Sequence, residues 1–226
     1  MHRTLRDKKI LVTAGPTWVP IDSVRVISNI SSGLTGITIA QHAASRGADV
    51  TLLLGPACIK DSLACRNRKP GQAKLKIVRF KYFDELKRII ERQLDEKKYD
   101  ILIHTAAVSD YRPVKVFNGK IKSGKQELKI FLKPTLKLTD ILKRNGRGAF
   151  LVMFKLEVKT SRKKLIDAAY KDMIRAGADL VVANNLEDIN ETSHKGYVID
   201  LKKKVNSVAT KKELADRLFQ IILERL

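Results

Sequence analysis

Short apolar runs alternate along this chain with longer segments whose apolar side chains recur every three to four positions. The short runs predict buried strands. The longer segments predict amphipathic helices, because a period of three to four positions places the apolar side chains on one face of a helix. The predicted strands are 9–13, 49–54, 75–80, 100–104, 149–154 and 178–184. The predicted helices are 34–47, 82–98, 139–144, 161–176 and 211–226. This alternation is typical of an α/β protein with a mostly parallel sheet covered by helices.

Two relationships within the predicted sheet follow from this order. Strands 9–13 and 49–54 are joined by one helix and should therefore lie side by side in parallel. Strand 100–104 is almost wholly apolar, which predicts a central position. It leads into residues 105–111 at its carboxyl end, where the ligands of open α/β sheets bind.

The helical pattern stops at residue 112. Residues 112–134 instead show apolar positions alternating with polar ones, and Asn118-Gly119 and Ser123-Gly124 are turn signals. We expect a β-hairpin flap here, with a mobile lysine-rich loop over 120–125. A further strand pair is expected at 195–201 and 204–208, and residues 58–74 read as a basic, exposed connection. No linker divides the chain, so residues 1–226 are expected to form a single domain.

The segment between the first strand and the first helix is rich in small residues. Gly15 and Thr17 follow the strand, and Ser31 and Gly33 precede the helix. Free backbone N–H groups and the helix dipole favour a phosphate at such a helix start. Neither the dinucleotide fingerprint nor the P-loop motif is present. The local chemistry therefore leaves phosphate binding and close helix–sheet packing as open alternatives.

Composition narrows the class of protein. The chain is 44% hydrophobic and 31% charged, as in globular proteins. The apolar runs stay below the about 20 residues that a membrane span needs, and no signal peptide is recognised, so we expect a cytoplasmic protein with no membrane partner. Cys58 and Cys65 show neither a metal nor a disulfide pattern.

The net charge of +21 is unusual. It fits a nucleic-acid partner, polyanionic small molecules, or adaptation to heat. The lysines are scattered along the chain, and no recognition helix or aromatic RNA-binding motif is evident, so a basic nucleic-acid-binding Rossmann-like module is the alternative and not the preferred reading. A nicotinamide oxidoreductase is disfavoured because the glycine fingerprint is missing.

Several separated stretches carry a resemblance to one family. They are Thr13–Thr17, Asp22–Arg25, Ile27–Gly33, Ala106–Tyr111, Lys120–Lys122, Phe154–Glu157 and Asp179–Asn184. In this order they resemble phosphopantothenate–cysteine ligase over roughly residues 8–220. The resemblance implies a modified Rossmann-like three-layer αβα sandwich with a mostly parallel sheet and a β-hairpin flap, and a homodimer. It also implies a stand-alone form of the ligase, without the flavin-dependent decarboxylase half, so no flavin is expected.

The family's reaction has two steps. A nucleoside triphosphate, CTP or ATP, activates the carboxylate of 4′-phosphopantothenate as an acyl-nucleotidylate and releases pyrophosphate. The amine of L-cysteine then attacks the acyl carbon and releases the nucleoside monophosphate. Mg²⁺ is expected with the triphosphate, held mostly by phosphate oxygens and water. Both steps need positioning and charge stabilisation, and no nucleophile–base arrangement stands out among the four histidines or elsewhere.

The resemblance assigns a role to particular residues. Asn29 would hold the amide or carbonyl of the substrate and its acyl-nucleotidylate, and Lys120 would neutralise the triphosphate from the flap. Arg25 would reach the substrate phosphate across the dimer. The residues implied in binding phosphopantothenate are Arg25, Asn29, Ala106, Ala107 and Asp110. The residues implied in binding the nucleotide are Gly15, Thr17, Ser31, Gly33, Gly36, Asp110, Lys120, Phe154 and Asn184.

Each of these residues also has a plain structural explanation. Asn29 suits a turn or a helix cap, Lys120 suits a solvated hairpin, and Phe154 suits the core. The glycines suit helix–sheet packing, and strand-end aspartates such as Asp110 are frequent in turns.

The chain departs from the family pattern in three places. Ser123 stands where a third flap lysine often occurs, and Leu138–Ile141 replaces an Asn-Pro-Asp-Ile motif. Lys155 replaces a small residue, as in the ATP-using type. The triphosphate-binding lysines before the last parallel strand have no clean counterparts; Lys164, Lys171 and Arg175 are candidates. CTP is preferred over ATP, the choice stays open, and no protein ligand of Mg²⁺ is identified.

Overall fold

The computed structural model describes residues 4–56, 75–124, 126–189 and 193–226, and it centres on an eight-stranded sheet. The strands of this sheet are β1 (Lys9–Ala14), β4 (Asp49–Leu54), β5 (Leu75–Arg79), β6 (Ile101–His104), β9 (Phe150–Glu157), β10 (Leu180–Asn185), β11 (Gly196–Asp200) and β12 (Val205–Val208). Their order across the sheet is β12-β11-β10-β9-β6-β1-β4-β5. Strands β5, β4, β1, β6, β9 and β10 pair in parallel with their neighbours, whereas β11 and β12 add an antiparallel edge.

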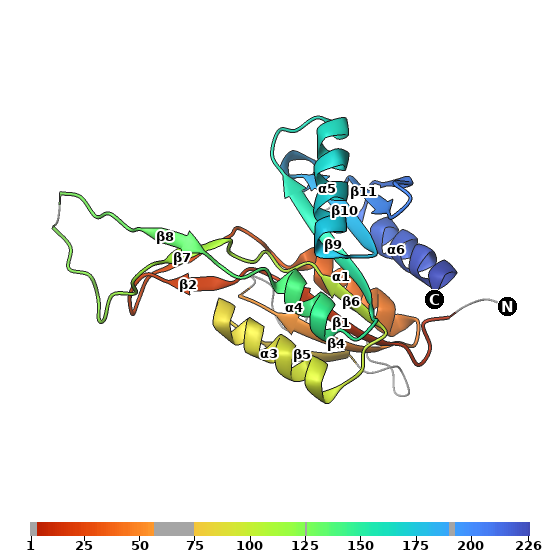
Figure 1. The fold of residues 1–226 in the computed structure, drawn as a ribbon, viewed down its shortest axis with the longest axis horizontal. Helices are drawn as coiled ribbons and strands as arrows, with labels where there is room; N and C mark the ends of the chain where they lie inside the picture. Colours follow the sequence, from red (N-terminus) through yellow and green to blue (C-terminus); the bar gives the residue numbers. More distant parts are fainter. Residues whose placement is uncertain (1–3, 57–74, 125, 190–192) are drawn as a thin grey trace.

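Helices cover both faces of the sheet (Figure 1). They are α1 (Leu34–Ser45), α3 (Phe83–Glu96), α4 (Leu138–Asn145), α5 (Arg162–Ala176) and α6 (Lys211–Arg225). Side chains alternate across each strand, so Val12 of β1 packs with α1 and α6 while its neighbour Leu11 packs with α3, α4 and α5. The three-layer αβα sandwich with a mostly parallel sheet is thereby confirmed.

The predicted neighbours in the sheet are also confirmed. β1 pairs in parallel with β4, with Ile10 opposite Val50. β6 lies between β1 and β9, so this almost wholly apolar strand is central, as predicted. Its residues are all buried because both faces of the strand are covered by helices.

The flap contains a short hairpin, as the alternating pattern over 112–134 predicted. The three-residue strands β7 (Tyr111–Pro113) and β8 (Leu132–Pro134) pair antiparallel there. The segment between them also bonds to the chain near Ile21: Phe117 N–H donates to the carbonyl of Ile21 at 2.9 Å. Lys125 and the expected connection 58–74 lie outside the described residues.

A second hairpin stands where the sequence analysis expected only a loop. β2 (Trp18–Pro20) and β3 (Val26–Ser28) pair antiparallel, and β2 also contacts β7. Together β2, β3, β7 and β8 project from the sheet as an arm, on the left in Figure 1. A 3₁₀ turn at Leu186–Asp188 was likewise not predicted. None of the described helices is long and apolar enough to cross a membrane.

Candidate functional site

The loops that follow β1 and β6 are joined into one structural unit. Ala107 N–H donates to the carbonyl of Gly15 at 3.0 Å, and Thr17 N–H donates to the carbonyl of Ala107 at 3.3 Å. The Thr17 side chain is fully buried, and its hydroxyl oxygen accepts the N–H of Ser109 at 3.0 Å. Thr17 therefore braces the two loops internally. We call Gly15–Thr17 together with Ala106–Ser109 the ledge.

Asn29 attaches the segment that precedes α1 to this ledge. Its side-chain nitrogen Nδ2 donates to the carbonyl oxygens of Ala107, at 3.2 Å, and Val108, at 3.0 Å. Among the residues that the structure describes, none donates a hydrogen bond to the amide oxygen Oδ1. Asn29 is exposed, so this oxygen is available to a ligand lying on the ledge.

The beginning of α1 lies directly against the ledge. Gly33 is the N-cap and has a left-handed backbone with φ of 73°. A Cβ at Gly33 would lie 3.2 Å from the backbone nitrogen of Gly15, so glycine permits this close approach. Gly33 has no side chain to cap the helix, but Ser31 Oγ accepts the N–H of Gly33 at 3.4 Å and Ser32 Oγ accepts the N–H of Leu34 at 3.3 Å. Among the described residues no group accepts the N–H of Thr35 or Gly36, so these two N–H groups of the first turn can bind an anion beside Asn29.

Gly36 has a packing explanation. A Cβ at this position would lie 2.4 Å from the hydroxyl oxygen of Thr105 and 2.5 Å from the Cβ of Ala14. The residue faces the sheet and is what lets α1 pack closely on β1 and β6. Its contact with a nucleotide stays a prediction.

The residue predicted to read the base is held inside the protein. Asn184 lies near the carboxyl end of β10, is 3% exposed, and has its amide nitrogen 3.0 Å from His194 Nε2. His194 Nδ1 lies 3.5 Å from the hydroxyl of Thr35 in α1. Burial, and next the charge of Lys211, lower the pKa of His194 to about 4. Asn184 and a neutral His194 therefore connect β10 to the beginning of α1.

Sequence reasoning did not single out His194, because it follows β10 by a turn and no local spacing relates it to Asn184. Phe154 is half-buried and packs on the same side of the sheet as α1. The structure thus brings Phe154 and Asn184 to the α1 face of the sheet, and Gly15, Gly33 and Asn29 to its carboxyl edge.

The remaining predicted residues lie on or near the arm. Lys120 is exposed in the flap loop. Asp110 is exposed at the start of β7 and pairs with Lys137 at 2.5 Å. Arg25 lies in the β2–β3 turn and forms an ion pair with the buried carboxylate of Asp22. Asp22 was part of the quoted resemblance but had no role assigned to it.

Two cations near α5, Lys155 and the candidate Arg175, are engaged with acids. Lys155 Nζ lies 3.1 Å from Glu157 and 3.0 Å from Asp172, and Arg175 also pairs with Asp172 at 3.0 Å. Burial lowers the pKa of Lys155, but the hydrogen bonds to Asp172 and Glu157 outweigh it and raise that pKa above its ordinary value. A triphosphate would have to compete with these acids for Lys155 and Arg175.

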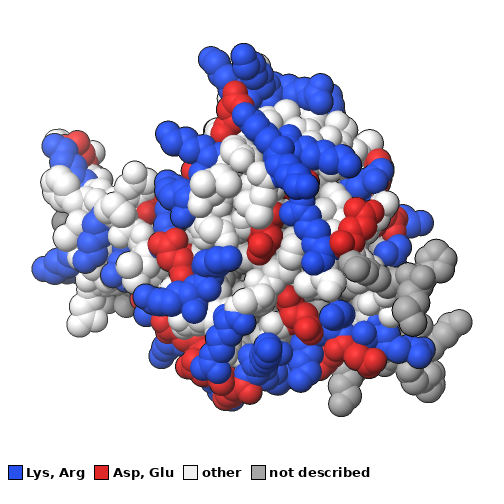
Figure 2. Space-filling model, turned by 45° about the vertical axis from the view of Figure 1, so that its right-hand side comes forward, with Lys and Arg blue, Asp and Glu red and all other residues white. Residues whose placement is uncertain are grey.

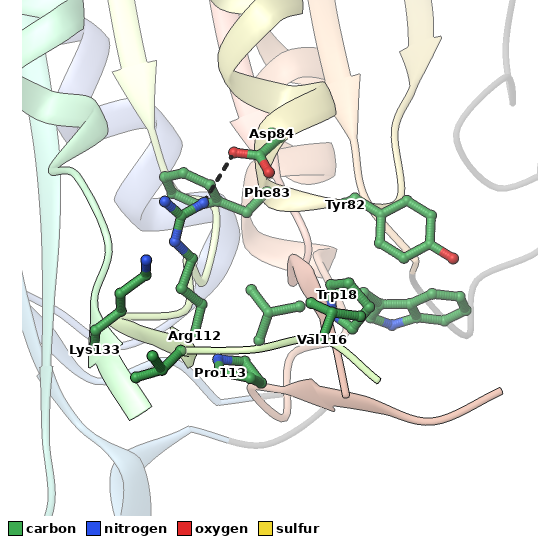
Figure 3. Close-up of a pocket in the computed structure, with 11 residues that line it drawn as sticks. Trp18, Tyr82, Phe83, Asp84, Arg112, Pro113, Val116 and Lys133 are labelled. Carbon is green, nitrogen blue, oxygen red and sulfur yellow. Dashed lines mark ion pairs between the residues drawn. The ribbon is translucent and has the colours of Figure 1, made fainter. Parts of the chain in front are cut away.

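A cavity of about 260 Å³ lies under the base of the arm (Figure 3). Trp18 and Tyr82 meet edge to face on one side of it, and Arg112, on the other, pairs with Asp84 at 3.6 Å. None of the predicted site residues lines this cavity. It is therefore separate from the ledge.

On the face shown in Figure 2, the surface charge does not form one basic patch. In Figure 2 lysines and arginines are spread over the visible face with acidic residues between them, and they crowd most closely over α5. Within the described ranges, no group of three His, Cys, Asp or Glu side chains could hold a metal ion.

The fold and the candidate site together define an open α/β sheet protein whose candidate ligand site lies at the carboxyl ends of the strands, beside a helix start. Comparison with known proteins narrows this class. The family model for the DNA/pantothenate metabolism flavoprotein C-terminal domain matches residues 5–226, so the chain belongs to that family.

Individual relatives agree with this assignment. The chain is 40% identical, over 99% of its length, to the coenzyme A biosynthesis bifunctional protein CoaBC of Thermococcus kodakarensis. It covers 53% of that protein, so it spans about half the length of this curated relative. The crystal structure of the DNA/pantothenate metabolism flavoprotein from Streptococcus pneumoniae is similar with a TM-score of 0.83 at 30% identity, over 97% of this chain and 100% of that one. The crystal structure of the C-terminal domain of a CoaBC protein has a TM-score of 0.76 at 27% identity, over 99% of this chain and 97% of that one.

Proposed function

We propose that this chain is a phosphopantothenate–cysteine ligase domain that forms 4′-phosphopantothenoylcysteine in coenzyme A biosynthesis. The observation that carries the proposal is the Asn29 amide, fixed on the carbonyls of Ala107 and Val108 beside the uncapped start of α1. This arrangement offers a polar acceptor for the substrate amide next to an anion site. The family membership supplies the chemistry that such a site would serve.

The residues of the chain would act by positioning and by charge. The free N–H groups of α1 bind phosphate oxygens, and Asn29 Oδ1 accepts an N–H of the pantothenate chain. The small side chains of Ala106 and Ala107 leave room for that chain along the ledge. The Lys120 side chain reaches from the flap to stabilise negative charge that develops at the α-phosphate, and the cysteine amine then attacks the activated carboxyl carbon.

Mg²⁺ bound with the triphosphate would neutralise part of its charge. The described residues fit such an ion because they provide no dense cluster of ligands that would compete with the phosphates. We propose no flavin for this domain, because the family's flavin chemistry belongs to the decarboxylase half. The reaction uses charged metabolites, and we expect it in the cytoplasm.

We propose CTP over ATP as the nucleotide. Phe154 would flank the base, and Asn184 would recognise it through its amide oxygen, since its amide nitrogen faces His194 at 3.0 Å. Asp110 would contact the substrate or the ribose once Lys137 is displaced.

We also propose a homodimer formed through the arm, in which Arg25 of each protomer reaches the substrate phosphate of the other. The arm and its surroundings expose large apolar side chains, among them Val24 at 63%, Ile30 at 104% and Phe131 at 76%. Such exposure on a projecting element is typical of a surface covered by a partner. Light scattering should give the mass of a dimer, and Phe131→Glu should shift it toward the monomer and lower activity. A fully active monomer would contradict this arrangement.

The decisive test measures pyrophosphate release with 4′-phosphopantothenate, L-cysteine and Mg²⁺, in parallel with CTP, ATP, GTP and UTP. Release should require phosphopantothenate, and the matching monophosphate should accumulate only when cysteine is added. CTP should be the best substrate. No release with any nucleotide would overturn the ligase proposal and make salt-dependent nucleic-acid binding the next measurement.

A further inference from the structure

We propose that Asp22 is a positioning residue that clamps the Lys120 loop of the flap and the guanidinium of Arg25 in one arrangement. The role in catalysis rests on the ligase function proposed above. Asp22 itself is 3% exposed and its side chain is fully buried, so it would act through Arg25 and Lys120 and not by touching a ligand.

The first carboxylate oxygen of Asp22 organises the β2–β3 turn. Oδ1 accepts the backbone N–H of Val24 at 2.8 Å and that of Arg25 at 2.7 Å. Aspartate commonly stabilises turns in this way, by accepting N–H groups two and three residues ahead. These two hydrogen bonds are local, and stabilisation of the turn alone would explain them.

The second carboxylate oxygen makes the long-range connection. Oδ2 accepts the backbone N–H of Ile121 at 3.0 Å and also accepts from Nη1 of Arg25. The same Nη1 of Arg25 donates to the carbonyl of Ile121 at 3.3 Å. Asp22, Arg25 and Ile121 therefore form a closed triangle of hydrogen bonds between the turn and the flap.

The triangle holds Ile121, which follows Lys120 in the sequence. Gly119, which precedes Lys120, is also bonded to the β2–β3 turn. Ser23 N–H donates to the carbonyl of Gly119 at 3.2 Å. Lys120 thus has both neighbours bound to the β2–β3 turn while its own side chain is exposed. The backbone position of Lys120 is set by Asp22 and Ser23, and only its side chain is left to move.

The charges make this clamp persistent. Burial would raise the pKa of the Asp22 carboxyl, but the hydrogen bonds from Ile121, Val24 and Arg25 hold that pKa well below its ordinary value. The carboxylate is therefore ionised at neutral pH, and a buried ionised acceptor forms strong hydrogen bonds. A loss of Asp22's charge should therefore loosen two cations of the proposed site together.

The variant Asp22→Asn separates the two halves of the side chain. An asparagine can keep Oδ1 on the N–H groups of Val24 and Arg25 and so preserve the turn. Its amide nitrogen would then face two donors, the N–H of Ile121 and the guanidinium of Arg25, and could accept from neither. We expect pyrophosphate release to slow by about tenfold or more, because misplaced charged groups lose much of their effect on a transition state.

Asp200 offers a matched control at the other end of the sheet. Its Oδ1 accepts the N–H groups of Lys202 at 2.8 Å and Lys204 at 2.9 Å, and its Oδ2 pairs with Arg225 at 2.6 Å. Asp200→Asn likewise alters a buried acid that stabilises a turn and pairs with an arginine, but this acid does not contact the flap. The variant should lower thermal stability as Asp22→Asn does and leave pyrophosphate release unchanged.

Two further readouts separate positioning from general destabilisation. In a background of Lys120→Ala and Arg25→Ala together, the added Asp22→Asn should slow release less than threefold, because both residues through which it acts are already missing. Hydrogen exchange should show a faster-exchanging Ile121 amide in Asp22→Asn than in the wild type, without any ligand.

A full tenfold loss from Asp22→Asn in the background that lacks both cations, or unchanged exchange at Ile121, would overturn the clamp. An inactive wild type would overturn the proposed ligase function instead, and exchange at Ile121 would then decide alone whether Asp22 holds the flap.

Discussion

The Asn29 amide nitrogen lies 3.2 Å from the carbonyl oxygen of Ala107, although the two residues are 78 positions apart in the sequence. This contact joins the segment before α1 to the segment after β6. It also fixes which atom of Asn29 is available to a ligand: the nitrogen is engaged, and the oxygen is not. The site proposed here is built from this one relationship outward.

Asn29→Asp should slow the second half-reaction. The new carboxylate would face the carbonyl oxygens of Ala107 and Val108, which offer no proton, so the side chain would turn away from the ledge. Rapid-quench analysis with CTP should show pyrophosphate released ahead of the monophosphate. Asn145→Asp, on α4, serves as the control and should behave as the wild type. Normal breakdown of the acyl-nucleotidylate in Asn29→Asp would refute the assigned role.

Lys120→Ala should separate activity from stability. Its side chain is exposed on the flap, so the thermal unfolding curve should be nearly unchanged. Turnover should fall by about a hundredfold or more, as for loss of one group that stabilises transition-state charge. Lys129, another exposed flap lysine, pairs with Glu127 at 3.3 Å, and Lys129→Ala should retain normal turnover. Equal effects of the two substitutions would remove Lys120 from the mechanism.

Gly36→Ala should destabilise the fold. The added methyl would overlap the side chains of Thr105 and Ala14, both held in the sheet layer, and α1 would have to move outward. Overpacking of this kind costs about 1–3 kcal/mol, measurable by urea unfolding. Gly148→Ala is a useful comparison because nothing lies within 4 Å of its added methyl and only its φ of +86° is unfavourable. A Gly36 variant as stable as the wild type would show that the helix is not in close contact there.

Stability should fall as the pH decreases from about 6.5 toward 4. Burial lowers the pKa of His104 from 6.5 to about 4, and it lowers the pKa of His194 to about the same value. The ring nitrogen Nδ1 of His104 lies 2.8 Å from Thr13 Oγ1. In this range the unfolded chain binds protons that the folded histidines do not, so acid favours unfolding by up to about 3 kcal/mol per histidine. Urea unfolding at several pH values should show a shallower dependence for His194→Gln. An unchanged slope would mean that His194 titrates normally in the folded protein.

Much of the framework follows from local patterns. The periodicity around Leu86 and Ile90 predicts helix α3, and the apolar run Ile101–Ile103 predicts strand β6. Both patterns are local, because a regular element buries the same faces along its whole length. The order of these elements then predicts that β1 and β4 are parallel neighbours. The small hairpin of β2 and β3 escaped prediction because its three-residue strands carry no repeat and are held by contacts such as Trp18 N–H to the carbonyl of Lys81, at 2.8 Å.

The sequence by itself determined the α/β class, the central strand and the loops that carry small and polar residues to the sheet's carboxyl edge, together with the family that those loops resemble. The tertiary structure decided which loops meet. It placed Asn29 on Ala107, Asn184 against His194, Gly36 against Thr105 and Asp22 against Ile121. The physical reason is the range of the interactions. Periodicity records which face of an element is buried, whereas a hydrogen bond between distant loops depends on where the assembled sheet and helices bring them.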